Sequence, residues 1–558
     1  SSSESISVPM IPLGLKETKE LDLLLPLKDF ISEHYGEEST LFEKEIKEFM
    51  ELRQAMRTPS RNEAGLELLM EYYNQLYFLD SRFFPPTKSL GVFFHWYDSL
   101  TGVPSHQRAL AFEKGSVLFN IGALHTQIGA RQDRASLPGL NQAIDAFQKA
   151  AGAFNYLKEN FSNAPSLDMS AASLNMLVRL MVAQVQECVF EKMTLLRAQH
   201  DFLTWLQLAQ EAARVEDAYS LVHQTMTQAH VKDYVPFSWT TMVHVKSEHF
   251  KALSHYFAAV ALCDCPASSD AELPEQEKAF LQFHVTMPEG PSLRVLLQDP
   301  EERRKLGKAH LKKAIMKHEE AMRIHGLCKI LRKMDILQEV LSFAHKRRSC
   351  CNYLTPSVCA FLSLPPAKTH QKPEVKSPNF SQVKVTDLFH RLGPLSVFSA
   401  KNKWYPARRV HLMRGENGFG FTLRGDSPVL IAGVIPGGCA AVSTCNAASG
   451  VSGLAPRGAG GFEHAEVVQL LKSTGKEGVE ISVITLQGSE GPKAADKKAA
   501  AMSSGSGMLK SNKENSRKSL MNSKSASTLL VWSKKSKRSK KSTYGVPFTT
   551  VGDNEAMY

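Results

Sequence analysis

The segment FEKGSVLFNIGALHTQIGA, residues 112–130, decides the fold class, because it is mostly apolar and rich in small residues. Small residues let two helices approach closely, while the larger side chains fill the space between them. A segment of this kind is stable as a helix when neighbouring helices press against it. It therefore predicts an α-helix buried inside a larger helical array.

The surrounding segments extend this helical pattern. Residues 143–161 (AIDAFQKAAGAFNYLKENF) repeat Ala and Phe as a helical repeat does. Residues 22–34 and 62–78 place apolar residues three and four apart, and residues 304–345 predict a long, charged amphipathic helix or helix pair. No strict 34-residue period is present, so from about residue 17 to 348 we expect a mainly α, irregular, curved helical solenoid.

The charge is concentrated at one end of the chain. The 558 residues carry a net charge of +11, but residues 489–558 hold fourteen Lys/Arg and five Asp/Glu, a net +9. The remainder carries only +2. A nearly neutral folded body argues against nucleic-acid binding as the main function. A chain of this length also predicts two or three folded units.

The nine cysteines are irregularly spaced, and an odd, unpatterned set favours the reduced thiols of a cytoplasmic protein. Cys263-Asp264-Cys265 brings two thiols too close for a usual zinc knuckle, with no second pair nearby. The sequence has no P-loop, no dinucleotide-binding glycine fingerprint, no HExxH helix and no nucleophile elbow. We therefore predict a protein that is not an enzyme and that has no metal or cofactor.

Three histidines, His310, His318 and His325, fall in the charged segment 304–345. His318-Glu319 begins like a zinc-protease helix, but the residue four positions later is Met322 rather than a second His. We expect these histidines to be solvated or partly packed.

Five motifs together resemble the Bro domain of Alix-like endosomal proteins, and the resemblance covers about residues 5–405. The motifs are FHWYD at 94–98, EKGSVLFN at 113–120, AQVQECVFEK at 183–192, TDLF at 386–389 and GPLSV at 393–397. The resemblance implies a curved solenoid with a TPR-like core over residues 1–405. It also implies binding of the amphipathic C-terminal helix of an ESCRT-III subunit in an apolar groove.

The resemblance places the groove on two successive helices. Its first position falls on Val189, and an apolar pair falls on Phe202 and Leu206, or on Thr204 and Leu208 if two residues are inserted. The alternative is that these residues are ordinary interhelical packing, since an apolar stripe is more often core than ligand groove.

A change to glycine-rich, strand-like alternation near residue 409 marks a second unit, and residues 410–435 resemble the first half of a PDZ domain. Gly418-Phe419-Gly420-Phe421 matches the loop whose backbone N–H groups bind a peptide carboxylate. The strand that follows, residues 421–424, would accept a peptide as an added strand. Taken alone, this motif is also compatible with a simple hairpin turn.

Later segments complete the resemblance only in part. Residues 464–472 resemble the helix that borders the peptide groove, in which His464 bonds a Ser/Thr of the ligand and Val468 lines the groove. Residues 480–485 give a last strand. Residues 437–461 contain no Asp, no aromatic residue and no alternating pattern, which predicts that a central strand is missing. We expect an incomplete PDZ-type β-barrel with a helix over residues 406–488.

Residues 489–558 are rich in Ser and Lys and are expected to be disordered. The basic cluster at 534–541 suits anionic phospholipids or a nuclear-import signal, or is simply solvated. The final residues, Ala556-Met557-Tyr558, are of the apolar type that a PDZ groove accepts.

The order of Bro domain, PDZ-type module and basic tail resembles the rhophilin family, specifically its second vertebrate paralogue. The resemblance implies a cytoplasmic scaffold in Rho signalling and actin organisation. In that family a Rho-binding coiled coil precedes the Bro domain, but no heptad-rich segment precedes Ser1, so direct Rho binding is not carried over. The alternative is an endosomal ESCRT-III-binding or membrane-surface-binding protein without Rho involvement. We expect a cytoplasmic location, with association with perinuclear or endosomal membranes as an alternative.

Overall fold

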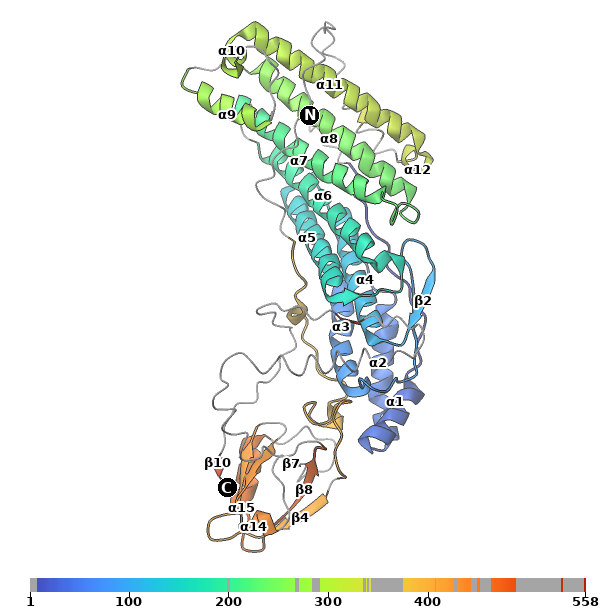
Figure 1. Ribbon diagram of the computed structural model, residues 1–558, viewed down its shortest axis with the longest axis vertical. Coiled ribbons are helices and arrows are strands. Elements are labelled where there is room, and N and C mark those ends of the chain that lie inside the picture. Colours follow the sequence, from blue (N-terminus) through green and yellow to red (C-terminus); the bar gives the residue numbers. More distant parts are fainter. Residues whose placement is uncertain are drawn as a thin grey trace.

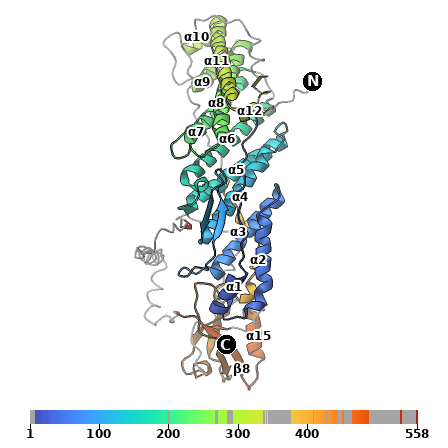
Figure 2. The ribbon, with the colours of Figure 1, turned by 90° about the vertical axis from the view of Figure 1, so that its right-hand side faces the viewer.

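The computed structural model is an elongated stack of α-helices with a small β-sheet module at one end (Figure 1). A view turned by 90° shows the helices stacked along the same long axis (Figure 2). The structure describes residues 8–197, 201–265, 270–283, 292–334, 338, 341–342, 375–406, 408–425, 429–442, 449–451, 463–487, 533–534 and 556–557.

The helical body consists of helices that follow one another along the stack, as the sequence predicts. The first half contains α1 (Leu24–Phe30), α2 (Glu43–Met56), α3 (Glu63–Phe83), α4 (Leu110–Ala130) and α5 (Leu137–Asn160). The second half contains α6 (Ala171–Leu196), α7 (Phe202–Met226), α8 (Phe237–Asp264), α9 (Leu273–Phe283), α10 (Leu293–Gln298), α11 (Pro300–Leu327) and α12 (Lys329–Arg332). None of the described helices is both long and apolar enough to cross a membrane.

Local sequence signals explain where several helices begin. The side chains of Asn62, Ser136 and Ser170 each accept a backbone N–H in the first turn of α3, α5 and α6. Such caps satisfy N–H groups that have no partner inside the helix. Helix α4 has buried residues along its whole length, as its composition predicts.

One element of the body was not predicted. The FHWYD motif forms strand β1 (Phe94–Tyr97), which pairs antiparallel with β2 (Pro104–Gln107). The side chain of Asp98 accepts the N–H groups of Leu100 and Thr101 at the turn between them. Strand β1 of this hairpin packs beside α4 within an otherwise helical body.

An extended segment returns along the body after α12. The side-chain amide of Asn74 donates to the carbonyls of Phe380 and Val383, at 2.9 and 2.7 Å. Arg82 donates to Asp387 from both Nε and Nη2, at 3.0 and 2.8 Å. Within residues 385–397 the structure has a 3₁₀ turn at His390–Leu392. Side chains of α3 hold this segment against the body.

The C-terminal module is built on a six-stranded sheet in the order β10-β5-β6-β7-β8-β4. Its strands and helices are β4 (Arg408–Leu412), β5 (Phe421–Arg424), β6 (Leu430–Val434), α14 (Cys439–Val442), β7 (Ser449–Val451), α15 (His464–Ser473), β8 (Val479–Thr485) and β10 (Ala556–Met557). A separate apolar core lies beneath the sheet, and it includes Leu412, Ile431 and Val483.

Strand β7 corrects the expectation that a central strand is missing. Gly450 pairs with Leu430 of β6 on one side and with Ile484 of β8 on the other. Three residues thus fill the position between β6 and β8, although they lack the alternating pattern that sequence analysis looks for. The remaining residues of the atypical segment, 443–448 and 452–461, lie outside the described residues.

A short stem joins the module to the helical body. The N–H of Tyr405 donates to the carbonyl of Thr485, and the N–H of Gln487 donates to that of Lys403. Between these bonds, the ring of Trp404 packs against His34, Tyr35 and Phe398, with centroids 5.2, 5.7 and 5.2 Å away. Residues 403–405 and 485–487 therefore meet in one short stem beside α1, while β10 joins the module from the tail.

Most of the tail lies outside the described residues, including the basic cluster apart from Lys534. Two short strands of the tail are described. Strand β9 (Ser533–Lys534) pairs antiparallel with β3 (Phe161–Ser162) at the end of α5. Strand β10 pairs with β5 in the module.

Gly152 tests the packing of the returning segment. A Cβ atom at this position would lie 1.6 Å from the carbonyl oxygen of Lys376. We expect Gly152→Ala to destabilise the body by about 1–3 kcal/mol, the usual range for overpacking. Gly326→Ala is the control, since nothing lies within 4 Å of its Cβ, and it should be neutral or stabilising by up to about 1 kcal/mol. Thermal unfolding followed by circular dichroism measures both, and equal melting temperatures for the two variants would contradict the packing.

His125 gives the body a predictable dependence on pH. Burial lowers the pKa of this α4 side chain from 6.5 to about 4; Lys149 adds to this effect and Asp145 opposes it. Below pH 6.5 the unfolded chain binds a proton that the folded protein excludes, so stability falls as the pH drops from 6.5 towards 4. The full effect is about 3 kcal/mol. His125→Gln should remove this part of the acid sensitivity, seen as a smaller loss of stability between pH 7 and 4.5 than in the unmodified chain. Parallel pH profiles would contradict the assignment.

Candidate docking surfaces

The motifs that carry the family resemblance place polar side chains inside the body. Glu113 is 0% exposed. Its carboxylate accepts hydrogen bonds from Tyr72 Oη and Trp96 Nε1, both at 2.7 Å, and from Arg53 Nε at 2.9 Å. A buried carboxylate that accepts three hydrogen bonds holds together the elements that supply the donors, and we call such a group a structural junction.

A second junction lies in the AQVQECVFEK motif on α6. Lys246 Nζ lies 3.0 Å from Glu187 Oε2, and both side chains are fully buried. Arg134 lies 2.8 Å from Glu191, whose pKa burial raises to about 8 against the opposing effect of Arg134. Gln184 also accepts the N–H of Ile11 from the N-terminal segment. These groups tie together separate elements of the body.

The residues predicted for the helix groove are divided between core and surface. Phe202, Leu206 and Leu208 on α7 are 3%, 0% and 2% exposed and belong to the main core. Arg303 of α11 lies over the Phe202 ring at 4.8 Å. Helix α9 also packs on α7. Val189 and Thr204 are half-buried.

An accessible apolar stripe remains on α6. Val189 and Met193 are half-buried, and Leu196 is 56% exposed. Spacings of four and three residues place all three on one face of the helix. This stripe, Val189, Met193 and Leu196, is the part of the predicted groove region that a partner can reach. Sequence analysis identified only its first member.

The predicted carboxylate loop of the module leads into β5. Gly418 and Gly420 have φ values of 91° and 83°, a backbone region that favours glycine. The rings of Phe419 and Phe421 are buried in the module core. Among the described residues, no backbone carbonyl accepts from the N–H groups of Phe419 or Gly420. The loop thus has the form expected for an anion-binding turn.

Helix α15 carries the two predicted groove residues. His464 and Val468 are half-buried and lie four residues apart, so they share one face of the helix. His464 Nδ1 lies 3.1 Å from the carbonyl oxygen of Gly425, directly after β5. A neutral histidine ring that donates through one nitrogen accepts through the other, so a ring of this kind can bond either a carbonyl or a hydroxyl group. The structure therefore links the loop, β5 and α15 at one edge of the sheet.

The histidines of α11 differ from the prediction. His310, His318 and His325 are 0%, 0% and 7% exposed, so the expectation that they are solvated or partly packed was wrong. The prediction failed because the sequence around these histidines is highly charged, although they lie on the inner face of α11, which packs against α8. Within the described part of the chain, no group of three or more His, Cys, Asp or Glu side chains is arranged to hold a metal ion. The five described cysteines, which include Cys263 and Cys265, form no disulfide with one another.

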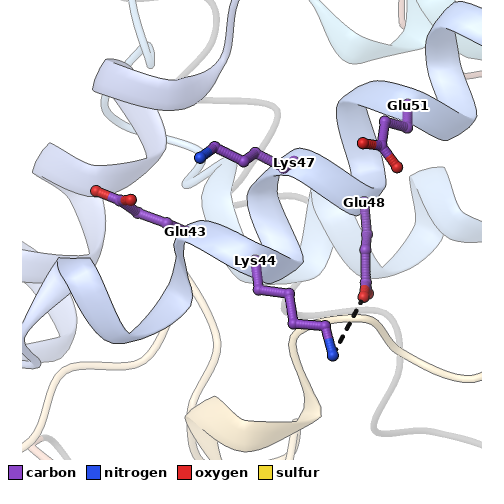
Figure 3. Close-up of a pocket in the computed structure, with 5 residues that line it drawn as sticks. All are labelled: Glu43, Lys44, Lys47, Glu48 and Glu51. Carbon is purple, nitrogen blue, oxygen red and sulfur yellow. Dashed lines mark ion pairs between the residues drawn. The ribbon is translucent and has the colours of Figure 1, made fainter.

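A shallow depression on α2 does not qualify as a site. Its lining consists of Glu43, Lys44, Lys47, Glu48 and Glu51, all from the same helix (Figure 3). Lys44 Nζ lies 3.8 Å from Glu48 Oε1, a pair of neighbours on an exposed helix face. Such pairs contribute little and mark a solvated surface.

Comparisons with known proteins agree with this architecture. A family model described as BRO1-like domain matches residues 10–412. Rhophilin-1 from Homo sapiens is 54% identical over 98% of this chain and 82% of its own length. Rhophilin-2 from Canis lupus familiaris is 48% identical over 87% of this chain and 72% of its own length. The family prediction is confirmed, and the identity to the two Rhophilin-1 sequences (54% and 51%) is higher than the 48% identity to Rhophilin-2.

Solved structures share the helical fold. The ALIX BRO1 CHMP4C complex matches with a TM-score of 0.50 and 24% identity, covering 69% of this chain and 100% of that chain. ALIX in complex with the SIVmac239 PYKEVTEDL late domain matches with a TM-score of 0.50 and 25% identity, covering 70% of this chain and 52% of that chain. The helical body is thus a Bro fold, and with the identities to the rhophilins it shows that this chain belongs to the rhophilin family of Bro-domain adaptors.

Proposed function

We propose that this chain is a non-catalytic, cytoplasmic scaffold that binds C-terminal peptides of partner proteins at the β5 edge of its module. The observation that carries the proposal is that β5 pairs with β6 on one side and accepts an added strand, β10, on the other. Strand addition to such an edge is a common mode of peptide recognition.

The surroundings of β5 supply the chemistry for this mode. The loop at 418–421 offers backbone N–H groups to a peptide carboxylate, and His464 on α15 stands beside the end of β5, where a histidine ring can form a hydrogen bond with a Ser or Thr hydroxyl. Val468, on the same face of α15 as His464, lines an apolar position beside them. These three features select an extended peptide with a free carboxylate and a hydroxyl-bearing residue close to it.

The helical body would serve as the platform for this module. Family membership supports a place in Rho-linked signalling to the actin cytoskeleton, in which the scaffold holds a peptide-bearing partner next to a second protein on the body.

A second candidate function is docking of an amphipathic helix on the α6 stripe. Its support is the exposure of Leu196 together with the half-buried Val189 and Met193 on one helix face. This candidate ranks second because the apolar groove residues of both alternative registers on α7 lie in the core. These residues are Phe202 and Leu206 in one register and Leu208 in the other.

Peptide binding is best titrated on the full chain carrying Ala556→Pro and Met557→Pro, which removes β10 from the β5 edge. The probes are labelled decapeptides that end in Thr-X-Val, with a free or an amidated C-terminus, followed by fluorescence anisotropy. We expect micromolar binding of the free acid and at least about tenfold weaker binding of the amide, because charge-assisted hydrogen bonds are lost.

Two α15 variants of the same protein sharpen this test. His464→Ala should weaken the Thr peptide several-fold and leave an Ala-X-Val peptide unchanged, whereas the exposed Gln469→Ala should affect neither. Equal binding of free acid and amide would rule out the proposed carboxylate loop.

The α6 stripe is tested with the C-terminal helix peptide of an ESCRT-III subunit by calorimetric titration. Val189→Asp should abolish any binding, and Leu196→Asp, at the most exposed position of the stripe, checks that this loss does not come from unfolding. Leu221→Asp, at a position 43% exposed on α7, should change nothing. Leu208→Asp should instead lower the stability by about 3 kcal/mol or more, because it places a charge in the core. Identical titrations of Val189→Asp and the unmodified chain would remove the stripe from consideration.

A further inference from the structure

The edge of β5 already has an occupant from the same chain. Ala556 pairs with Leu423 and Met557 pairs with Thr422, in antiparallel orientation. β10 is therefore the edge strand on the β5 side of the six-stranded sheet, and β4 forms the other edge (Figure 1). An incoming peptide that adds a strand to β5 would need the same backbone groups, since each N–H and C=O of an edge serves one neighbouring strand.

The sequence of β10 is compatible with this position. The apolar Met557 belongs to the residue class that such grooves accept. β10 nevertheless has Ala556 opposite Leu423, and alanine has no hydroxyl for His464. Backbone pairing is thus available to β10, whereas the hydroxyl contact is not.

We propose that residues 556–557 act as an intramolecular cap, which occupies the peptide site and must be displaced before a partner peptide binds. This inference rests on the proposed peptide site and identifies residues 556–557 as the segment that fills this site. The cap makes the module selective, because a ligand has to exceed the backbone pairing of β10 with additional contacts such as a hydroxyl to His464.

A two-residue strand is sufficient for this role because it belongs to the same chain. Attachment to the same chain raises the effective concentration of a segment above that of a dilute free peptide, so even weak pairing competes with an incoming ligand. The same tether makes the cap reversible, since two paired residues contribute little free energy individually. A ligand with a carboxylate and a hydroxyl has the means to displace it.

The experiment compares the unmodified full chain with the Ala556→Pro, Met557→Pro variant. An Ala556→Val, Met557→Ile variant, which keeps strand-forming residues, is the matched control. Hydrogen–deuterium exchange is measured for the β5 amides, and a labelled peptide of residues 549–558 (TTVGDNEAMY) is titrated in trans. In the proline variant we expect the outward-facing β5 amides to exchange roughly tenfold faster. The peptide should bind the proline variant at least about tenfold more tightly than the other two proteins.

The outcomes separate the cap from the site. Unchanged β5 exchange in the proline variant, or equal peptide affinity for all three proteins, would overturn the cap and leave the peptide site standing. Faster β5 exchange without any peptide binding would support the cap and argue against the proposed function. β5 protection that increases with protein concentration would assign the pairing to a second copy of the chain and overturn the intramolecular form.

Discussion

The buried carboxylate of Glu113 is the constraint on which the first half of the body depends. A charge without access to water is tolerated only when donors surround it, and removing one donor leaves an uncompensated charge. Its donors come from α2, α3 and β1, while Arg53 also donates to the backbone of Lys19. Three elements and the N-terminal segment must therefore assemble around α4 in one arrangement.

The same device recurs along the stack. Glu187, fully buried, pairs with Lys246 of α8, and Arg82 holds Asp387 of the returning segment. Each junction joins elements that are distant in the sequence. Because buried ion pairs add little net stability, apolar packing supplies the stability of the body, and the ion pairs select one arrangement of its elements. The result is a platform whose surfaces keep a fixed relation to one another, which is what a scaffold requires. Glu113 and Glu187, which belong to two of the family motifs, are buried at these junctions, so these motif positions specify the platform itself.

Sequence analysis was most successful where periodicity carries the information. The buried segment 112–130 and the Ala/Phe pattern of 143–161 correspond to α4 and α5, because burial on a helix repeats every three to four residues. It failed for residues whose burial or pairing is determined by tertiary contacts. Leu208 and His318 are core residues because neighbouring helices cover them, which no single-helix pattern reveals. The three-residue β7 has too few positions to show alternation, and the pairing of β10 with β5 joins residues more than a hundred positions apart.

The stem at Trp404 has a consequence for how the module could be cut out of the chain. The hydrogen bonds between residues 403–405 and 485–487 bring the two ends of the segment 405–487 together. A folded unit whose ends lie close together tolerates insertion into, or removal from, a longer chain. Excision at the stem would uncover the rings of His34, Tyr35 and Phe398, which Trp404 contacts, and would leave β10 without β5.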